Sequence, residues 1–161
     1  MDLHEAPRQQ AKVLTVSDGV IAGTRDDRSG QALADRLTAA GWQVVERRVV
    51  ADGVESVSIA LIDMAAGFNG VIATTGGTGF GPRDLTPEGT RAAIDREAPG
   101  LAEAMRLVSP LGRLSRGVAG TIGTALVVNG PGSTAGAVET IDAILDVMPH
   151  AVRLLAGERE H

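Results

Sequence analysis

The sequence is poor in the residues that carry redox, covalent and base-stacking chemistry. It contains no cysteine and no tyrosine, one tryptophan and two phenylalanines. The absence of cysteine excludes disulfides, thiol nucleophiles, iron–sulfur clusters and thiolate zinc sites. Aromatic side chains make up only 2% of the chain, too few for a surface that stacks single-stranded bases. The 15 basic and 20 acidic residues give a net charge of −5, which argues against binding to nucleic acid.

Lysine and histidine are scarce as well. Lys12 is the only lysine, so Schiff-base chemistry has no residue in the loops discussed below. His4, His150 and His161 lie far apart in the sequence, which argues against a metal cluster and a Ser-His-Asp triad. No apolar run approaches the roughly 20 residues of a membrane span, and the acidic N-terminus does not resemble a secretory signal. We therefore expect a cytoplasmic protein without a membrane partner.

Glycine, by contrast, is abundant, with 21 residues in a chain of 161. This length suits one domain, and we expect residues 1–161 to form it, with residues 1–10 as a flexible N-terminal tail.

The more polar run at residues 42–50 indicates an edge strand. The alternation of strand and helix patterns predicts an α/β fold, a three-layer α/β/α sandwich with a mostly parallel central sheet. Three short apolar runs are typical of parallel strands buried on both faces: residues 13–16, 71–74 and 125–128.

Capping patterns predict where the helices begin. Ser29 is expected to cap one helix, and Thr86 another, with proline and an acid in its first turn. Pro99 indicates the start of a further helix. The last helix is expected to begin near Ser133 and to break or kink at Pro149.

The loop at residues 74–88 follows a buried strand and precedes a helix, and ligands of such sheets bind beyond the carboxyl ends of the strands. Its glycines allow the backbone to approach a ligand closely, and its amides are placed to hold phosphate oxygens. It is not a Walker A loop, because the Gly-Lys-Ser/Thr ending is missing. The alternative is a flexible loop without a ligand. Asp84 is either an acid at the start of a helix or a ligand of Mg²⁺.

Two other loops follow apolar runs. Residues 17–30 are long for a connection from a strand to a helix, which points to function, although a surface loop with a serine cap explains them equally well. Residues 129–135 match the Gly-x-Gly-x-x-Ala pattern of dinucleotide-binding proteins, but no second strand follows them. What remains for this segment is a helix N-terminus that offers free amides to an anion.

The polar residues of these loops favour one class of reaction. Glycine amides and hydroxyl groups are available, together with acids and arginines. This inventory suits phosphoryl or nucleotidyl transfer by positioning and Mg²⁺, in which the substrate supplies the nucleophile. The charged members are Asp18, Asp52, Asp84, Arg28, Arg83 and Arg116.

Several motifs occur together in this chain. Thr-Gly-Gly-Thr-Gly at residues 75–79 is followed by Asp-x-Thr-Pro-Glu at residues 84–88. This pair resembles the signature of the MogA/MoaB family of molybdenum cofactor biosynthesis. The resemblance implies a molybdopterin-binding fold, a homotrimer or homohexamer, and contacts with other proteins of molybdenum cofactor biosynthesis. Further segments resemble the family over nearly the whole chain: residues 15–18, 27–30, 95–100, 115–120 and 131–133.

The resemblance also implies molybdopterin adenylyltransferase activity, in which the terminal phosphate of molybdopterin attacks the α-phosphate of ATP and pyrophosphate leaves. By position, the two functional aspartates of the family fall on Asp52 and Asp84, to which the catalytic role and the binding of Mg²⁺ with ATP are assigned. Without the resemblance, Asp52 is equally well explained as a turn acid. The substrate-binding residues that the resemblance implies are Ser17, Asp18, Thr75, Gly76, Gly77, Thr78, Gly79, Ser115, Arg116, Pro131, Gly132 and Ser133.

The chain departs from the family in two places. After Pro-Gly-Ser the family often carries a lysine, whereas this chain has Thr-Ala-Gly at residues 134–136. Residues 118–120 and 131–134 resemble the MoaB branch, whose members do not all adenylylate. One alternative is therefore a MoaB-like protein that binds molybdopterin without adenylyl transfer. Another is a different nucleotide or pterin-phosphate enzyme on the same scaffold. Phe80 would either stack on a pterin or pack against the protein.

Overall fold

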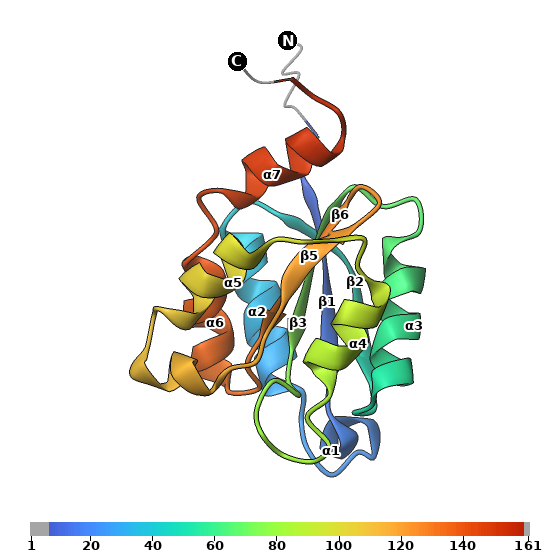
Figure 1. The fold of residues 1–161 in the computed structure, drawn as a ribbon, viewed down its shortest axis with the longest axis vertical. Coiled ribbons are helices and arrows are strands. Elements are labelled where there is room, and N and C mark those ends of the chain that lie inside the picture. Colours follow the sequence, from blue (N-terminus) through green and yellow to red (C-terminus); the bar gives the residue numbers. More distant parts are fainter. Residues whose placement is uncertain (1–6, 160–161) are drawn as a thin grey trace.

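The computed structural model describes residues 7–159, which form one six-stranded sheet between two layers of helices (Figure 1). This confirms the predicted α/β fold with a mostly parallel sheet. The strands are β1 (Gln10–Val16), β2 (Gln43–Val50), β3 (Gly70–Thr75), β4 (Arg96–Glu97), β5 (Ala119–Ile122) and β6 (Ala125–Gly130). The helices are α1 (Asp18–Ile21), α2 (Arg28–Ala39), α3 (Val54–Ala65), α4 (Thr86–Ala93), α5 (Pro99–Arg106), the 3₁₀ helix η1 (Pro110–Leu114), α6 (Thr134–Asp142) and α7 (Met148–Leu155).

The strand order is β2-β1-β3-β6-β5-β4, and the first four strands run parallel. As predicted, the polar strand β2 lies at an edge. β5 and β6 form an antiparallel hairpin, and β4 pairs antiparallel with β5. Thr15 pairs with Thr75, and Thr75 with Gly130. The carboxyl ends of β1, β3 and β6 therefore lie side by side, and the loops that follow them meet at one edge of the sheet.

The core has two halves, one on each face of the sheet, because successive side chains of a strand point to opposite faces. Every residue of β3 and β6 is buried, as expected for strands covered on both sides. Leu37 and Leu126 belong to the half beneath α2, α5, α6 and α7. Leu61 and Ile72 belong to the half beneath α3 and α4. Each such fully buried aliphatic side chain stabilises the fold by roughly 1.5–3 kcal/mol.

Two of the expected helix caps are wrong. Ser29 lies inside α2, and the cap is Asp27, whose carboxylate accepts a hydrogen bond from the amide of Gly30 at 3.1 Å. Thr86 is the first helical residue of α4 rather than its cap, and its hydroxyl donates to the carbonyl of Gly76 at 2.8 Å. In both cases a tertiary contact decides which residue caps the helix. For α2, the hydroxyl of Thr15 also donates to the Asp27 carboxylate at 2.9 Å.

The last helical segment is divided differently from the expectation. Ser133 caps α6, as predicted, by accepting a hydrogen bond from the amide of Gly136. However, α6 ends at Asp142, and Pro149 lies in the first turn of α7. Proline is tolerated there because the amides of a first turn have no partner within the helix. The break therefore precedes Pro149.

At the N-terminus, residues 1–6 of the expected tail lie outside the described residues. Gln10 already belongs to β1, where it pairs with Gln43 and Gly70, and the side-chain amide of Gln9 donates to the carbonyl of Pro149 at 3.0 Å. No helix within residues 7–159 is long and apolar enough to cross a membrane.

Candidate functional site

A cleft of about 1060 Å³ opens at the carboxyl edge of the sheet. It lies between the loops that follow β1, β2, β3 and β6, with one wall formed by η1. Asp18 and Arg116 do not line it, although the sequence predicted them as substrate-binding residues. The other predicted site residues do: Ser17, Asp52, Thr75, Gly76, Gly77, Thr78, Gly79, Asp84, Ser115, Pro131, Gly132 and Ser133.

The glycine loop (residues 76–85) begins with two residues that require glycine. Gly76 and Gly77 have φ of 104° and 70°, in the left-handed region that side chains disfavour. A Cβ at Gly76 would lie 2.2 Å from the carbonyl oxygen of Val16, and one at Gly77 would lie 2.2 Å from Oγ1 of Thr86. The loop therefore passes too close to β1 and α4 for any larger residue.

Some backbone amides of the glycine loop and of the start of α6 have no acceptor among the described residues. Within residues 7–159, the amides of Gly77, Thr78 and Gly79 donate no hydrogen bond. The same holds for Thr134 and Ala135, the first two residues of α6, where the helix dipole places partial positive charge. Gly77, Thr78, Gly79 and Thr134 line the same cleft, so their amides are available to an anionic ligand.

Asp18 and Asp52 hold each other by reciprocal hydrogen bonds. The amide of Asp18 donates to Oδ2 of Asp52 at 3.0 Å, and the amide of Asp52 donates to Oδ1 of Asp18 at 3.0 Å. Arg83 closes this pair, since its guanidinium donates to both carboxylate oxygens of Asp18 and to the carbonyl of Asp52. These bonds join the glycine loop to the loops that follow β1 and β2.

Arg116 joins the glycine loop to α4. Its amide donates to the carbonyl of Thr78 at 2.9 Å, and Nε donates to the carbonyl of Gly79 at 2.8 Å. Its terminal nitrogens bind the carbonyl of Asp84 and both carboxylate oxygens of Glu88. The guanidinium is thus already occupied by protein acceptors, and Arg116 does not line the cleft.

The electrostatics of the cleft centre on Asp52. Burial raises the pKa of its carboxyl above 3.8, and the charges of Asp18 and Asp84 raise it further, while the Asp18 amide and Arg83 oppose this. The pKa of Asp18, by contrast, is lowered by its hydrogen bonds from Arg83. Two acids, Asp52 and Asp84, thus face one cleft, and a cation between them would relieve their repulsion.

The donor set suits Mg²⁺. Asp52 and Asp84 each use Oδ2 to accept a backbone amide, from Asp18 and Gly81 respectively, and Oδ1 of each carboxylate accepts no hydrogen bond in the described part of the chain. Gly77 leaves room beside Oδ1 of Asp52, where a Cβ would approach to 3.1 Å. Within residues 7–159 no three acidic or histidine side chains gather as a metal site. Two carboxylates suffice, because Mg²⁺ usually completes its shell with water and substrate phosphates.

A second cavity, of about 260 Å³, adjoins the cleft. It lies between α5, η1, β6 and α6, and its lining includes Met105 and Val108. The two spaces share the lining residues Leu111, Ser115, Pro131 and Ser133. Apolar space next to a polar cleft suits a ligand with a flat ring and a charged tail.

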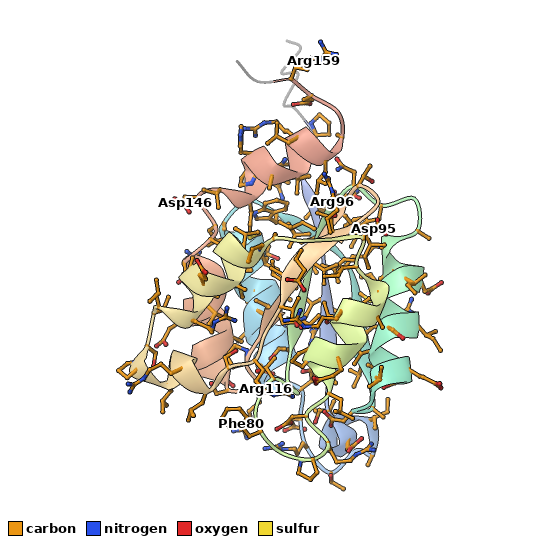
Figure 2. The ribbon with its side chains drawn as sticks, in the orientation of Figure 1. Phe80, Asp95, Arg96, Arg116, Asp146 and Arg159 are labelled. Carbon is orange, nitrogen blue, oxygen red and sulfur yellow. The ribbon has the colours of Figure 1, made fainter. Side chains whose placement is uncertain are left out.

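Sequence reasoning missed some of the cleft residues. Arg25, Leu111 and Leu114 line the cleft but were not singled out, although two arginines in one long loop are a visible signal. Phe80, for which stacking and packing were both considered, is 70% exposed and does not line the cleft. Figure 2 shows it on the glycine loop, not far from Arg116.

The fold and the cleft define a class of α/β proteins that receive their ligand at the carboxyl edge of a mostly parallel sheet. Residues 12–150 match the model of the family described as "Probable molybdopterin binding domain". The crystal structure of the molybdopterin biosynthesis enzyme MoaB from Thermus thermophilus superposes with a TM-score of 0.87 and 43% identity, covering 93% of this chain and 98% of that chain.

Curated relatives agree with this match. A Helicobacter pylori (strain J99) protein named molybdopterin adenylyltransferase is 34% identical over 152 residues, which is 90% of this chain and 86% of the relative. The Drosophila melanogaster molybdenum cofactor synthesis protein cinnamon is 37% identical over 155 residues, 91% of this chain but only 25% of that protein's length. The chain belongs to the MogA/MoaB molybdopterin-binding family of molybdenum cofactor biosynthesis proteins.

Proposed function

We propose that this chain binds molybdopterin and transfers AMP to it from ATP in the presence of Mg²⁺. An oxygen of the terminal phosphate of molybdopterin would form a bond to the α-phosphorus of ATP. The bond from that phosphorus to the oxygen bridging to the β-phosphate would break, and pyrophosphate would leave. The observation that carries this proposal is the pair Asp52 and Asp84 beside unpaired loop amides in one cleft.

In this proposal the protein supplies position and electrostatics rather than a nucleophile. The amides of Gly77, Thr78 and Gly79 would hold phosphate oxygens, and the N-terminus of α6 would hold a second anionic group. Asp52 and Asp84 would hold Mg²⁺, which neutralises phosphate charge when bound. A reaction in which both substrates carry phosphate depends mainly on such positioning.

The cavity that adjoins the cleft supports the binding of a ring. Its apolar lining by Met105 and Val108 would receive a flat heterocycle, and it shares Ser115 and Ser133 with the cleft. Molybdopterin and ATP both combine a heterocycle with a phosphate tail, so an apolar cavity continuous with a polar cleft matches their shared chemistry.

A second candidate function is the binding of molybdopterin without adenylyl transfer. It is favoured by the absence of lysine after Ser133, where this chain has Thr134 and Ala135, and by the likeness to MoaB. The two candidates share the cleft and differ in whether ATP is turned over.

Pyrophosphate release from MgATP in the presence of molybdopterin separates the candidates. We expect wild-type protein to release pyrophosphate. Asp52→Ala and Asp84→Ala should each lower the rate at least about 100-fold, because losing a residue that only supports a metal ligand already lowers activity by up to about 100-fold. Asp146→Ala is the matched control, because Asp146 is an exposed acid (Figure 2) that does not line the cleft.

Binding of molybdopterin without pyrophosphate release would overturn adenylyl transfer and favour the second candidate. Absence of molybdopterin binding to the folded wild-type protein would overturn both candidates. Equal rates for wild type and the two aspartate variants would show that Asp52 and Asp84 take no part in the mechanism.

A further inference from the structure

The cleft is lined by two basic side chains, Arg25 in the loop between α1 and α2 and Arg28 at the start of α2. Within residues 7–159, no other lysine, arginine or histidine lines it. Neither guanidinium makes a hydrogen bond or ion pair with another described residue, whereas Arg83 and Arg116 are bound to carboxylates. The acids that line the same cleft are Asp26, Asp52 and Asp84.

Gly19 builds the loop around Arg25. The carbonyl of Gly19 accepts hydrogen bonds from the amides of Thr24 and Arg25, at 3.0 and 3.2 Å. The stem of Arg25 crosses the Cα of Gly19 so closely that a Cβ there would lie 2.7 Å from Cδ of Arg25 and 3.1 Å from Cγ. The side chain of Arg25 is therefore directed by its own loop even though its charged end has no partner in the described part of the protein.

Arg28 occupies a position that stability alone does not explain. It is the first residue of α2, a helix of 12 residues. A cation at this end is disfavoured by the positive end of the helix dipole. Its neighbour Asp27 does not neutralise it, since the Asp27 carboxylate is held by Thr15, Gly30 and Arg47. An anion in the cleft would be attracted by Arg28 and by the N-terminus of α2 together.

We infer that Arg25 and Arg28 bind phosphoryl oxygens of the substrate and supply positive charge to the cleft. This inference rests on the proposed function, because it takes the ligands to be molybdopterin and MgATP. Both ligands carry phosphoryl groups, and the guanidinium fork matches two of their oxygens at once. Arg83 and Arg116 then serve to hold the loops rather than the substrate.

Titration calorimetry with two ligands tests the inference and identifies which phosphate is bound. The first ligand is α,β-methylene-ATP with Mg²⁺, in which the bond to the α-phosphate cannot be cleaved, and the second is molybdopterin. We expect Arg25→Ala and Arg28→Ala each to raise the Kd for one of the two ligands by about tenfold, as loss of a charge-assisted hydrogen bond does. The ligand whose Kd rises identifies which substrate's phosphate the arginine binds. Arg→Lys at either position should recover part of the affinity.

Arg96→Ala is the matched control. Arg96 is exposed, lies on β4 away from the cleft, and makes no ion pair within residues 7–159; Figure 2 shows it far from Phe80 and the glycine loop. Its loss changes the net charge of the protein equally, so its Kd values should match wild type. A second control is the thermal midpoint, which should be unchanged in Arg25→Ala because its guanidinium has no partner among the described residues.

A double-mutant cycle with Gly19 adds a test that bears on Arg25 alone. Gly19→Ala should displace the stem of Arg25 and weaken binding of the same ligand, but it should have no further effect in the Arg25→Ala background. The inference is overturned if wild type binds both ligands and the Kd values of the arginine variants lie within about twofold of the wild-type values. If wild type binds neither ligand, the proposed function fails and the inference falls with it, a result distinct from the first.

Discussion

At the scale of the residue, Asp52 combines partial burial with negative charge nearby. It lines the cleft, it accepts the amide of Asp18, and it faces the charges of Asp18 and Asp84. Burial is the largest cause of its raised pKa. Without a cation, the charged form of Asp52 is therefore a cost to the folded state, which a bound Mg²⁺ would relieve.

This cost predicts a pH-dependent gain in stability for Asp52→Asn. Because the folded-state pKa lies above the usual 3.8, the folded protein binds the proton more tightly than the unfolded chain, and stability is lost as pH rises through the folded pKa. In the presence of a chelator, the variant should have a higher thermal midpoint than wild type at pH 7, and the advantage should shrink as pH falls toward 3.8. An advantage that is independent of pH would contradict the prediction, and Asp146→Asn should show none.

Gly77 makes a second prediction at this scale. Its φ of 70° is in the left-handed region, and a Cβ would collide with Oγ1 of Thr86, which is fully buried. We expect Gly77→Ala to lower the free energy of unfolding by roughly 1–3 kcal/mol, measured by urea denaturation. Gly100→Ala is the control, because nothing lies near its Cβ position and its φ is not positive, so stability should stay equal or rise. Equal stability of Gly77→Ala and wild type would show that the loop is free to move.

Residue types in the loops could be predicted from the sequence, but their partners could not. Asp52 and Asp84 were predicted from the family resemblance, and both lie in the cleft. Nothing local in the sequence shows that the carboxylate of Asp18 bonds the amide of Asp52, 34 residues away. Such contacts form only when parallel strands bring distant loops to one edge.

At the scale of the element, the junction between the glycine loop and α4 depends on Arg116. Four hydrogen bonds of its side chain and one of its backbone amide reach acceptors in the loop or in α4. The pKa of Glu88 is lowered chiefly by the hydrogen bonds from this guanidinium. Since the pair is partly exposed to solvent, the ion pair alone contributes at most about 1 kcal/mol. The backbone carbonyls that it orders, including that of Asp84, matter more.

This arrangement predicts different outcomes for a positioning role and a substrate-binding role. If Arg116 holds the loop, Arg116→Ala should lower the thermal midpoint and reduce kcat of the proposed adenylyl transfer about tenfold, with little change in KM for ATP. Glu88→Gln should cause a smaller loss of the same kind. An increase in KM with an unchanged thermal midpoint would instead place Arg116 on the substrate.

The more deeply a strand or helix is buried, the more readily the sequence predicted it. The strands β1, β3 and β6 are short apolar runs in the sequence because both of their faces are covered. The two-residue strand β4 is exposed and exists only through its pairing with β5. The four-residue helix α1 has no buried residue, so neither element has a hydrophobic period to detect.

At the scale of the whole molecule, four exposed apolar side chains lie close together in the sequence, from the end of α5 through η1. Leu107 and Leu111 are 84% and 74% exposed, and Val108 and Leu114 are exposed beside them in the sequence. Apolar surface of this kind commonly marks a contact with another molecule. We propose that this surface is a contact between copies of the chain, in the trimer or hexamer that the family resemblance implies.

Light scattering on the purified protein tests this association. We expect a mass of three or six times the 16.5 kDa of one chain. Leu107→Ser should lower the mass at a given concentration if this surface is part of the contact, because it places a polar group where apolar area is buried. A mass of 16.5 kDa at all concentrations would contradict the prediction.

The sequence by itself determined the class of fold, the positions of the buried strands and the chemical character of the loops. It could do so because burial on both faces and close backbone approach each demand particular residue types: apolar side chains in β3 and β6, and glycine at residues 76 and 77. The absence of cysteine and the single lysine also limited the chemistry that the chain can perform.

Only the tertiary structure decided which charged residues face the cleft. Four arginines stand in or near the loops, and the sequence does not distinguish them. In the fold, Arg83 and Arg116 are bound to carboxylates, while Arg25 and Arg28 line the cleft without a partner in the described part of the chain. The reason is that the register of β1 against β2 places Asp18 beside Asp52, while the path of the glycine loop into α4 places Glu88 beside Arg116. Both are properties of the assembled fold.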